Sequence, residues 1–278
     1  MKKNRKFLSI LLMLTVVLSM SFAAMPAYAA SGTAISTADD LKAMASNPGG
    51  SYYLANDIEV PANLILFTSY DAPFTGTLDG NGHTIKGYTY TASADWTEQA
   101  ALFGYAKNAT FKNLKMTEVN ISLNQAGTVA ALVAASENCK FTDISVSGKI
   151  VGKSLSTAAG IVAYSYEGGT LTNCKNSADI TITNADEGSS AAGVAGFIGS
   201  AGSMKNCSNS GKISISGSIE AASISAAGVV LGVGKATSCK NSGTISVSAI
   251  GNGSMNDECI AAGVAVEVDT AVSCSNTG

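Results

Sequence analysis

The sequence has very few of the side chains that form most catalytic and metal sites. Among its 278 residues, Arg5 is the only arginine, His83 the only histidine and Trp96 the only tryptophan. A single histidine excludes the His-Glu-x-x-His zinc motif, which needs two histidines on one helix face. The lack of arginine beyond residue 5 removes the guanidinium that holds carboxylates and phosphates through paired hydrogen bonds. From these absences we predict a protein that is not an enzyme and has no catalytic residue, no metal ligand and no cofactor.

Basic residues are concentrated at the N-terminus, where they begin an export signal. Residues 2–6 hold four basic side chains and precede an apolar stretch over residues 7–25, and Ala27-Tyr28-Ala29 has the small-x-small pattern of a cleavage site. This arrangement predicts a signal peptide over residues 1–29. Without it the chain keeps 13 lysines and 20 acidic residues, and such a surface repels nucleic acid. We expect a secreted or cell-surface protein with no nucleic-acid partner and no membrane span after cleavage.

Internal repetition is the main signal in the rest of the chain. An Ala-Ala-Gly-aliphatic tetrad recurs four times at spacings of 33, 35 and 35 residues, and a Cys-x-Asn segment follows each copy. Periods of this length are typical of solenoids, in which each repeat buries its apolar side against its neighbours. The tetrads begin at Ala158, Ala191, Ala226 and Ala261, and the second segments contain Cys174, Cys207, Cys239 and Cys274.

Two divergent copies extend the array toward the N-terminus. Ala101-Leu102-Phe103 leads into Asn113-Leu114, and Ala131-Leu132-Val133 leads into Asp143-Ile144. When all copies are aligned, one column is apolar throughout, and buried cysteine behaves as a small hydrophobe. The asparagines two residues after the cysteines predict a second ladder, of stacked amides at a bend. We interpret the apolar column as an inward-facing ladder with one rung per coil, formed by Leu114, Ile144, Cys174, Cys207, Cys239 and Cys274.

A third segment of each repeat alternates β-branched apolar residues with hydroxyl residues, as in Ile180-Thr181-Ile182-Thr183. This period of two predicts a strand with one apolar and one polar face. Three such short runs per repeat and no helical period predict an all-β protein, a right-handed parallel β-helix with one coil per repeat. The outward hydroxyls are a candidate interaction face, although alternating strands need polar outward residues in any case. This face consists of Thr181, Thr183, Ser214, Ser216, Ser246 and Ser248.

The residues before the repeats follow a different pattern. Residues 36–44 combine an N-cap residue with acidic residues in a first turn, which predicts a short helix. Strand-like runs follow at residues 52–60 and 74–85. A helix placed over the first coil would cover its unpaired strand edges. We assign residues 30–98 to an N-terminal cap and first coil, and residues 99–278 to β-helix repeats of which the last is incomplete.

The pairing of the Ala-Ala-Gly-aliphatic segment with the Asn-Cys-x-Asn-Ser/Thr segment resembles the GLUG-motif repeats of secreted bacterial proteins. Residues 76–85 resemble the opening coil that often precedes such repeats, so the resemblance covers most of residues 36–278. It implies a surface protein or adhesin, or a repeat region beside the catalytic domain of zinc metallopeptidases that cleave immunoglobulin A1.

From the missing catalytic groups and this resemblance we predict a non-catalytic module for adhesion or for binding an unknown extracellular protein or glycan. One alternative is a polysaccharide lyase or hydrolase of the β-helix type, against which the scattered acidic residues argue, because hydrolysis uses paired carboxylates. The other alternative is a non-catalytic repeat region of a larger secreted zinc metallopeptidase.

The six cysteines have two structural roles open to them, because export permits disulfides. Stacking of the coils brings the ladder cysteines close together, yet parallel side-chain vectors need not satisfy disulfide geometry. We predict reduced, buried thiols in the ladder, with Cys139 and Cys259 outside it and not paired with each other.

Overall fold

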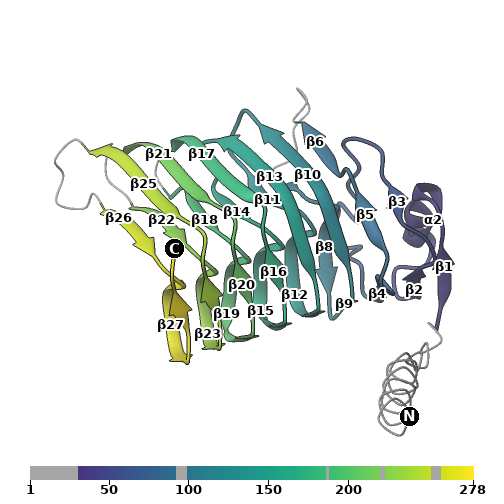
Figure 1. The fold of residues 1–278 in the computed structure, drawn as a ribbon. Helices are drawn as coiled ribbons and strands as arrows, with labels where there is room; N and C mark the ends of the chain where they lie inside the picture. Colours follow the sequence, from purple (N-terminus) through teal and green to yellow (C-terminus); the bar gives the residue numbers. More distant parts are fainter. Residues whose placement is uncertain (1–30, 92–98, 186–187, 220–222, 252–257) are drawn as a thin grey trace, which may run out of the picture. The chain divides into compact units, whose positions relative to one another are not determined.

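The computed structural model describes residues 31–91, 99–185, 188–219, 223–251 and 258–278, and the predicted signal peptide lies outside them. The chain winds through three sheets in turn, and the paired strands run parallel (Figure 1). Sheet C contributes six strands, one for each successive coil. The predicted all-β parallel β-helix is therefore confirmed.

Sheet A forms one side of every coil, and its long strands bend within their length. Its central strands are bonded in the order β9, β12, β15, β19, β23 and β27, each to the equivalent strand of the next coil. The strands of sheet A are β1 (Thr33–Ile35), β2 (Ser51–Leu54), β4 (Thr77–Asp79), β8 (Phe103–Lys107), β9 (Thr110–Lys112), β12 (Val133–Thr142), β15 (Val162–Thr172), β19 (Ala195–Lys205), β23 (Val230–Thr237) and β27 (Ala265–Val272).

Sheet B follows sheet A after a sharp corner, and it contains the alternating apolar and hydroxyl segments. Its strands are β3 (Ile58–Glu59), β5 (Thr84–Lys86), β6 (Thr89–Thr91), β10 (Lys115–Leu123), β13 (Ser145–Lys153), β16 (Lys175–Asn176), β17 (Asp179–Ala185), β20 (Ser208–Asn209), β21 (Ile213–Ile219), β24 (Lys240–Asn241), β25 (Ile245–Gly251) and β28 (Ser275–Asn276).

Sheet C closes each coil and contains the alanines of the tetrads. In the tetrad that begins at Ala158, both alanines end strand β14, and Gly160 and Ile161 turn the chain into sheet A. The strands of sheet C are β7 (Gln99–Ala100), β11 (Thr128–Ala130), β14 (Thr157–Ala159), β18 (Ser190–Ala192), β22 (Ser223–Ala227) and β26 (Glu258–Ala262).

The short helix predicted in the cap is present as α2 (Ala38–Ala43), which continues into the 3-10 turn η1 (Met44–Ser46). Thr37 is its N-cap, since the Thr37 hydroxyl accepts the Asp40 N–H and the Asp40 carboxylate accepts the Thr37 N–H. This reciprocal capping box fixes where the helix begins. Hydrogen bonds from the Ser36 N–H and around Thr37 hold the pKa of Asp40 below its ordinary value. Leu41 is fully buried, so the helix contributes to the same core as the coils.

The column predicted as an apolar ladder lies at the corner between sheets A and B. Its first five members are fully buried, and Cys274 in the last coil is half-buried. The residue before each rung has a positive φ, as in Asn113 (φ 52), Asp143 (φ 55) and Asn173 (φ 56). Asn and Asp tolerate this left-handed conformation better than other side chains. The tight corner thus explains why a polar residue precedes each buried rung.

The predicted amide ladder is formed by Asn176, Asn209, Asn241 and Asn276. Each side chain donates from Nδ2 to Oδ1 of the next, at 2.8, 2.9 and 2.7 Å. Each also holds the backbone two residues ahead, so Asn209 donates to the Gly211 carbonyl and accepts the Gly211 N–H. The first three amides are buried. Buried polar groups that are fully paired in this way stabilise one register.

The tetrad glycine packs directly against this ladder. A Cβ at Gly193 would lie 2.2 Å from the Gly228 carbonyl oxygen and 2.4 Å from Cγ of Asn209. Gly160 and Gly228 have the same relation to Asn176 and Asn241. The tetrad glycine and the ladder asparagine, 16 residues apart in the first two of these repeats and 13 in the last two, therefore contact each other across the coil.

The hydroxyl face predicted from the third segment is less regular than the sequence suggests. The register between β17 and β21 shifts after Ile182, where Asn184 takes a φ of 49°. As a result Thr183 is opposite Lys153 but has no registered partner in β21. A bulge therefore divides the predicted face. Its registered columns are Thr181, Ser214 and Ser246, and separately Ser216 and Ser248.

Replacing the ladder amide in the middle of the array is expected to destabilise the fold strongly. Asn209→Ala removes a buried side chain whose loss leaves the Asn176 amide and the Gly211 backbone without their partners, at a cost of about 3 kcal/mol. Asn276→Ala is the matched control, because Asn276 is exposed and water replaces its bonds. Urea unfolding of both variants measures the difference, and equal losses would show that burial of the ladder contributes nothing.

The cysteines differ sharply in exposure. All six are unpaired, and only Cys259 is exposed. Burial raises the pKa of Cys139 to about 11, and hydrogen bonding to the neighbouring rung together with burial raises the pKa of Cys207 and Cys239.

Because the thiolate is the reactive form, we expect one cysteine to react fast with an aromatic disulfide reagent at pH 8, and the buried thiols to react slowly until urea unfolds the chain. Cys259→Ser should abolish the fast phase of the reaction. A fast phase that persists in this variant would contradict the burial of the other cysteines.

Candidate functional site

The outer face of sheet A carries aromatic side chains in one register column. Tyr105 of β8 is opposite Ala135 of β12, which is opposite Tyr164 of β15, which is opposite Phe197 of β19. Tyr164 and Phe197 stack with ring centroids 5.5 Å apart. Tyr105 and Tyr164 are two strand spacings apart, about 9.6 Å, because the small Ala135 separates them. The alanine thus leaves a recess between two aromatic side chains.

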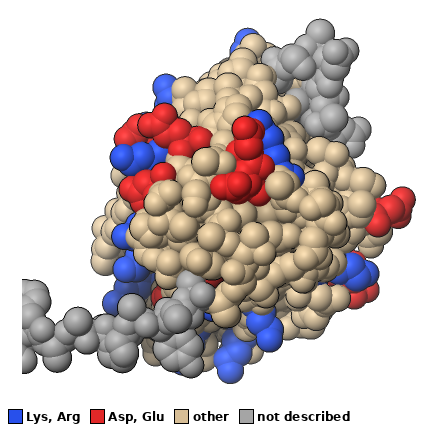
Figure 2. Space-filling model, turned by 90° about the vertical axis from the view of Figure 1, so that its right-hand side faces the viewer, with Lys and Arg blue, Asp and Glu red and all other residues tan. Residues whose placement is uncertain are grey.

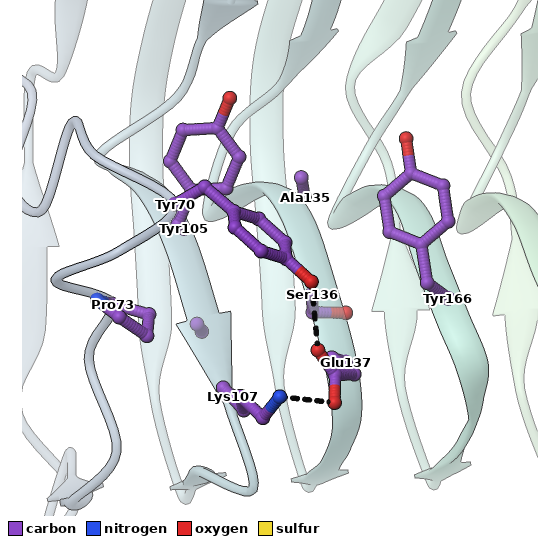
Figure 3. A pocket seen from close by; sticks show the side chains of 9 residues that line it. Tyr70, Pro73, Tyr105, Lys107, Ala135, Ser136, Glu137 and Tyr166 are labelled. Carbon is purple, nitrogen blue, oxygen red and sulfur yellow. Dashed lines mark hydrogen bonds and ion pairs between the residues drawn. The ribbon is translucent and has the colours of Figure 1, made fainter.

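A second column and a loop complete this recess, which we name the tyrosine pocket (Figure 3). Lys107, Glu137 and Tyr166 are opposite one another on β8, β12 and β15. Tyr70, from the segment between β3 and β4, meets Tyr105 edge to face at 5.8 Å. The pocket is shallow and open to solvent, and its enclosed space is about 10 Å³, far below the roughly 300 Å³ or more of a typical small-molecule site. It is lined by Tyr70, Pro73, Tyr105, Ala106, Lys107, Ala135, Ser136, Glu137 and Tyr166.

Polar contacts hold the pocket in shape. Lys107 Nζ lies 2.6 Å from Glu137 Oε1, and the Tyr70 hydroxyl donates to Glu137 Oε2 at 3.3 Å. The hydrogen bond from Lys107 lowers the pKa of Glu137, and the same bond raises the pKa of Lys107. Both groups are therefore charged at neutral pH and neutralise each other. Tyr70 and Tyr166 are 60% and 54% exposed, so both residues are accessible to a partner.

The tyrosine pocket is not among the sites predicted from the sequence. The hydroxyl residues of the predicted interaction face lie on sheet B, whereas the pocket lies on sheet A. Tyr70 belongs to the predicted cap and Tyr105 to a divergent repeat copy, so no phased motif connects them. The one available signal was that Tyr105 and Tyr164 occupy the same repeat position, with Tyr166 two residues further along.

In the part of the chain that the structure describes, no helix is both long and apolar enough to span a bilayer. The same described residues bring no three or more His, Cys, Asp or Glu side chains together as a metal site would require. His83, at a turn, has its Nδ1 3.4 Å from the Asp57 carboxylate.

Comparison with known proteins relates the N-terminal half of the chain to an endopeptidase family. Residues 27–148 match the model of the M26 IgA1-specific metallo-endopeptidase N-terminal region. No curated protein matches the chain. A Bacteroides ovatus crystal structure, described as a candidate immunoglobulin A1 protease, superposes with a TM-score of 0.51 at 14% identity, over 81% of this chain and 85% of its own. At that identity the likeness shows a shared fold alone.

An IgA1 protease structure also superposes, with a TM-score of 0.49 at 13% identity over 85% of this chain. This chain spans 20% of the length of that protease.

These findings correct the prediction that the protein is not an enzyme. The matching family model describes a region of a metallo-endopeptidase, so the chain stands in a protease context. The zinc of such an enzyme does not fit the residues present here, because the chain has one histidine and the described residues form no ligand cluster.

The Lys107–Glu137 pair is expected to give the pocket a defined pH dependence. Because the pKa of Glu137 is lowered in the folded chain, the ion pair stabilises the fold at pH values above the ordinary carboxyl pKa. This contribution is lost as the pH falls through the pKa that Glu137 has in the folded chain. Wild type should therefore melt higher than Glu137→Gln at pH 7, and the difference should shrink as the pH is lowered below the ordinary carboxyl range. Asp39→Asn is the control, since the exposed Asp39–Lys42 pair contributes little. A difference between wild type and Glu137→Gln that is as large at pH 3 as at pH 7 would contradict the role of this ion pair.

Proposed function

We propose that the chain is the N-terminal β-helix region of a secreted metallo-endopeptidase and that it binds the immunoglobulin A1 substrate of that enzyme. The match of residues 27–148 to the N-terminal region of the IgA1-specific family is the observation that supports this most directly. The basic, apolar and small-residue pattern of the first 29 residues supports secretion.

The tyrosine pocket is the proposed contact surface. Tyr70, Tyr105, Lys107 and Glu137 all belong to the matched residues 27–148, and Tyr166 follows on the next coil. Tyrosine offers a large rigid ring and a hydroxyl at a small entropy cost, which is why it is enriched where proteins bind proteins. The two exposed tyrosines of the pocket, Tyr70 and Tyr166, are of the residue type that often carries most of the binding energy in protein interfaces.

The coils that follow residue 148 carry the phased Ala-Ala-Gly and Cys-x-Asn segments. We assign them to GLUG-motif repeats on that pattern, and propose that they extend the same β-helix as a rigid support for the pocket. Adhesion to an extracellular protein or glycan stays a prediction, and the same binding experiments test it.

The decisive experiment measures binding of the purified chain to immobilised immunoglobulin A1 by biolayer interferometry, with immunoglobulin G as the specificity control. Tyr70→Ala combined with Tyr166→Ala should weaken binding about tenfold or more, because exposed aromatic anchors carry much of the energy of such interfaces. Ala135→Tyr should weaken it as well, since a third ring would fill the recess between Tyr105 and Tyr164.

Tyr53→Ala is the matched control, because Tyr53 is a half-buried tyrosine on β2, away from the pocket lining. It should leave affinity unchanged, and circular dichroism should show intact folds for all variants. Absence of binding by wild type, or unchanged binding by the Tyr70 and Tyr166 double variant, would refute the proposal.

A further inference from the structure

A second surface lies along the corner between sheets A and B, and its chemistry is different. Three outward-facing register columns flank this corner, two at the end of the sheet A strands and one at the start of sheet B. The first runs Thr110, Lys140, Thr170, Ser203, Lys235, Thr270. The second runs Lys112, Thr142, Thr172, Lys205, Thr237 and the third Lys115, Ser145, Lys175, Ser208, Lys240.

Lysine and hydroxyl residues fill almost every position of these columns. Seven of the 13 lysines that follow the leader lie here, although they are scattered singly in the sequence. Each of five successive coils presents one or two of them. We name this set the lysine edge, and its members are Lys112, Lys115, Lys140, Lys175, Lys205, Lys235 and Lys240.

The positive charge of the lysine edge is mostly not neutralised. Lys112 is paired with Asp79 at 3.1 Å, and none of the other six has a carboxylate at ion-pair distance among the described residues. Those six are exposed. Asp143 also lies at the corner, and its Oδ1 accepts the Asn173 amide. Figure 2 shows blue side chains along the lower rim, and other blue side chains beside the red ones in the upper half of the face in view.

The edge is straight, because the coils stack in register. Neighbouring coils are about 4.8 Å apart, so the lysines extend over about 19 Å along the axis. A hollow lined by Asp143, Ile144, Ser145, Asn173, Lys175 and Asn206 opens on it. Regular positive charge along a straight line is complementary to a linear polymer with repeated negative groups.

We infer that the lysine edge binds a linear anionic polysaccharide. The Ser and Thr residues between the lysines supply hydroxyl donors and acceptors suited to sugar hydroxyls. Nucleic acid is disfavoured, because none of the column positions is aromatic and binding of single strands depends on bases stacking on aromatic rings. This inference is independent of the tyrosine pocket, which lies at the other end of the sheet A strands.

The repeats themselves supply substitutions that the fold accepts. Lys175→Ser, Lys205→Thr and Lys240→Ser each introduce a residue that already occupies the same column in another coil. A matched control removes three lysines elsewhere through Lys42→Gln, Lys86→Thr and Lys153→Thr, with the same change of net charge. Lys86 and Lys153 are opposite threonines on neighbouring strands, so threonine suits both sites.

The experiment titrates the full chain with dextran sulfate and with polygalacturonate, with neutral dextran and single-stranded DNA as comparison probes, over a range of salt concentrations. We expect wild type to bind both anionic polysaccharides more tightly than DNA and not to bind neutral dextran. The edge variant should bind roughly fiftyfold more weakly at physiological salt, and its slope of log affinity against log salt should fall by about 2, as expected for three lost charge contacts. The control variant should lose less than about threefold.

Three outcomes would overturn the inference: no binding of either anionic polysaccharide at low salt, equal losses in the edge and control variants, or tighter binding to DNA than to the polysaccharides. A preference for dextran sulfate or for polygalacturonate would identify sulfate or carboxylate as the group recognised. Both preferences support the lysine edge.

Discussion

The amide ladder packed against the tetrad glycines is the constraint on which the rest of the structure depends. Asn209 is bonded to the amides above and below and to its own backbone, while Gly193 leaves no room for a side chain beside it. A slip of one residue would place a Cβ in that contact and leave buried amides unpaired, which costs far more than an imperfect apolar fit. The register of the successive coils is therefore determined at one point in each repeat.

A fixed register makes residues 29 to 35 positions apart in sequence into neighbours about 4.8 Å apart in space. Outward positions are free to vary, because the ladders and the apolar interior already define each coil. Two columns of sheet A carry Tyr105, Tyr164 and the Lys107–Glu137 pair, and the corner columns carry lysines among Ser and Thr. The β-helix thus forms separate surfaces of different chemistry from residues that no local motif connects.

This geometry also explains how much the sequence could predict. Inward positions repeat in every copy, so the coil, the apolar column ending in Cys274 and the amide ladder were evident from spacing. Tyr70 and the pocket it borders were not, because their residues come from the cap and from divergent copies. Lysines occupy a given column only in some coils, as at Lys115 and Lys175. An alignment of the repeats therefore shows a variable position there and not a row of positive charge. The bulge after Ile182 depends on a local backbone conformation that alternating residues do not reveal.

The protease context is the property least visible in these residues, since it depends on similarity and not on chemistry in the chain itself. A β-helix is nevertheless suited to such a role on physical grounds. The pocket residues Tyr70 and Glu137 are 67 positions apart yet hydrogen-bonded, and the hydrogen bonds between successive coils connect them through continuous parallel sheets. Ordering a binding surface before the partner arrives lowers the entropy cost of association. The tyrosine pocket and the lysine edge share no side chain, so a protein bound at the proposed pocket surface would leave the lysine edge accessible to a polymer.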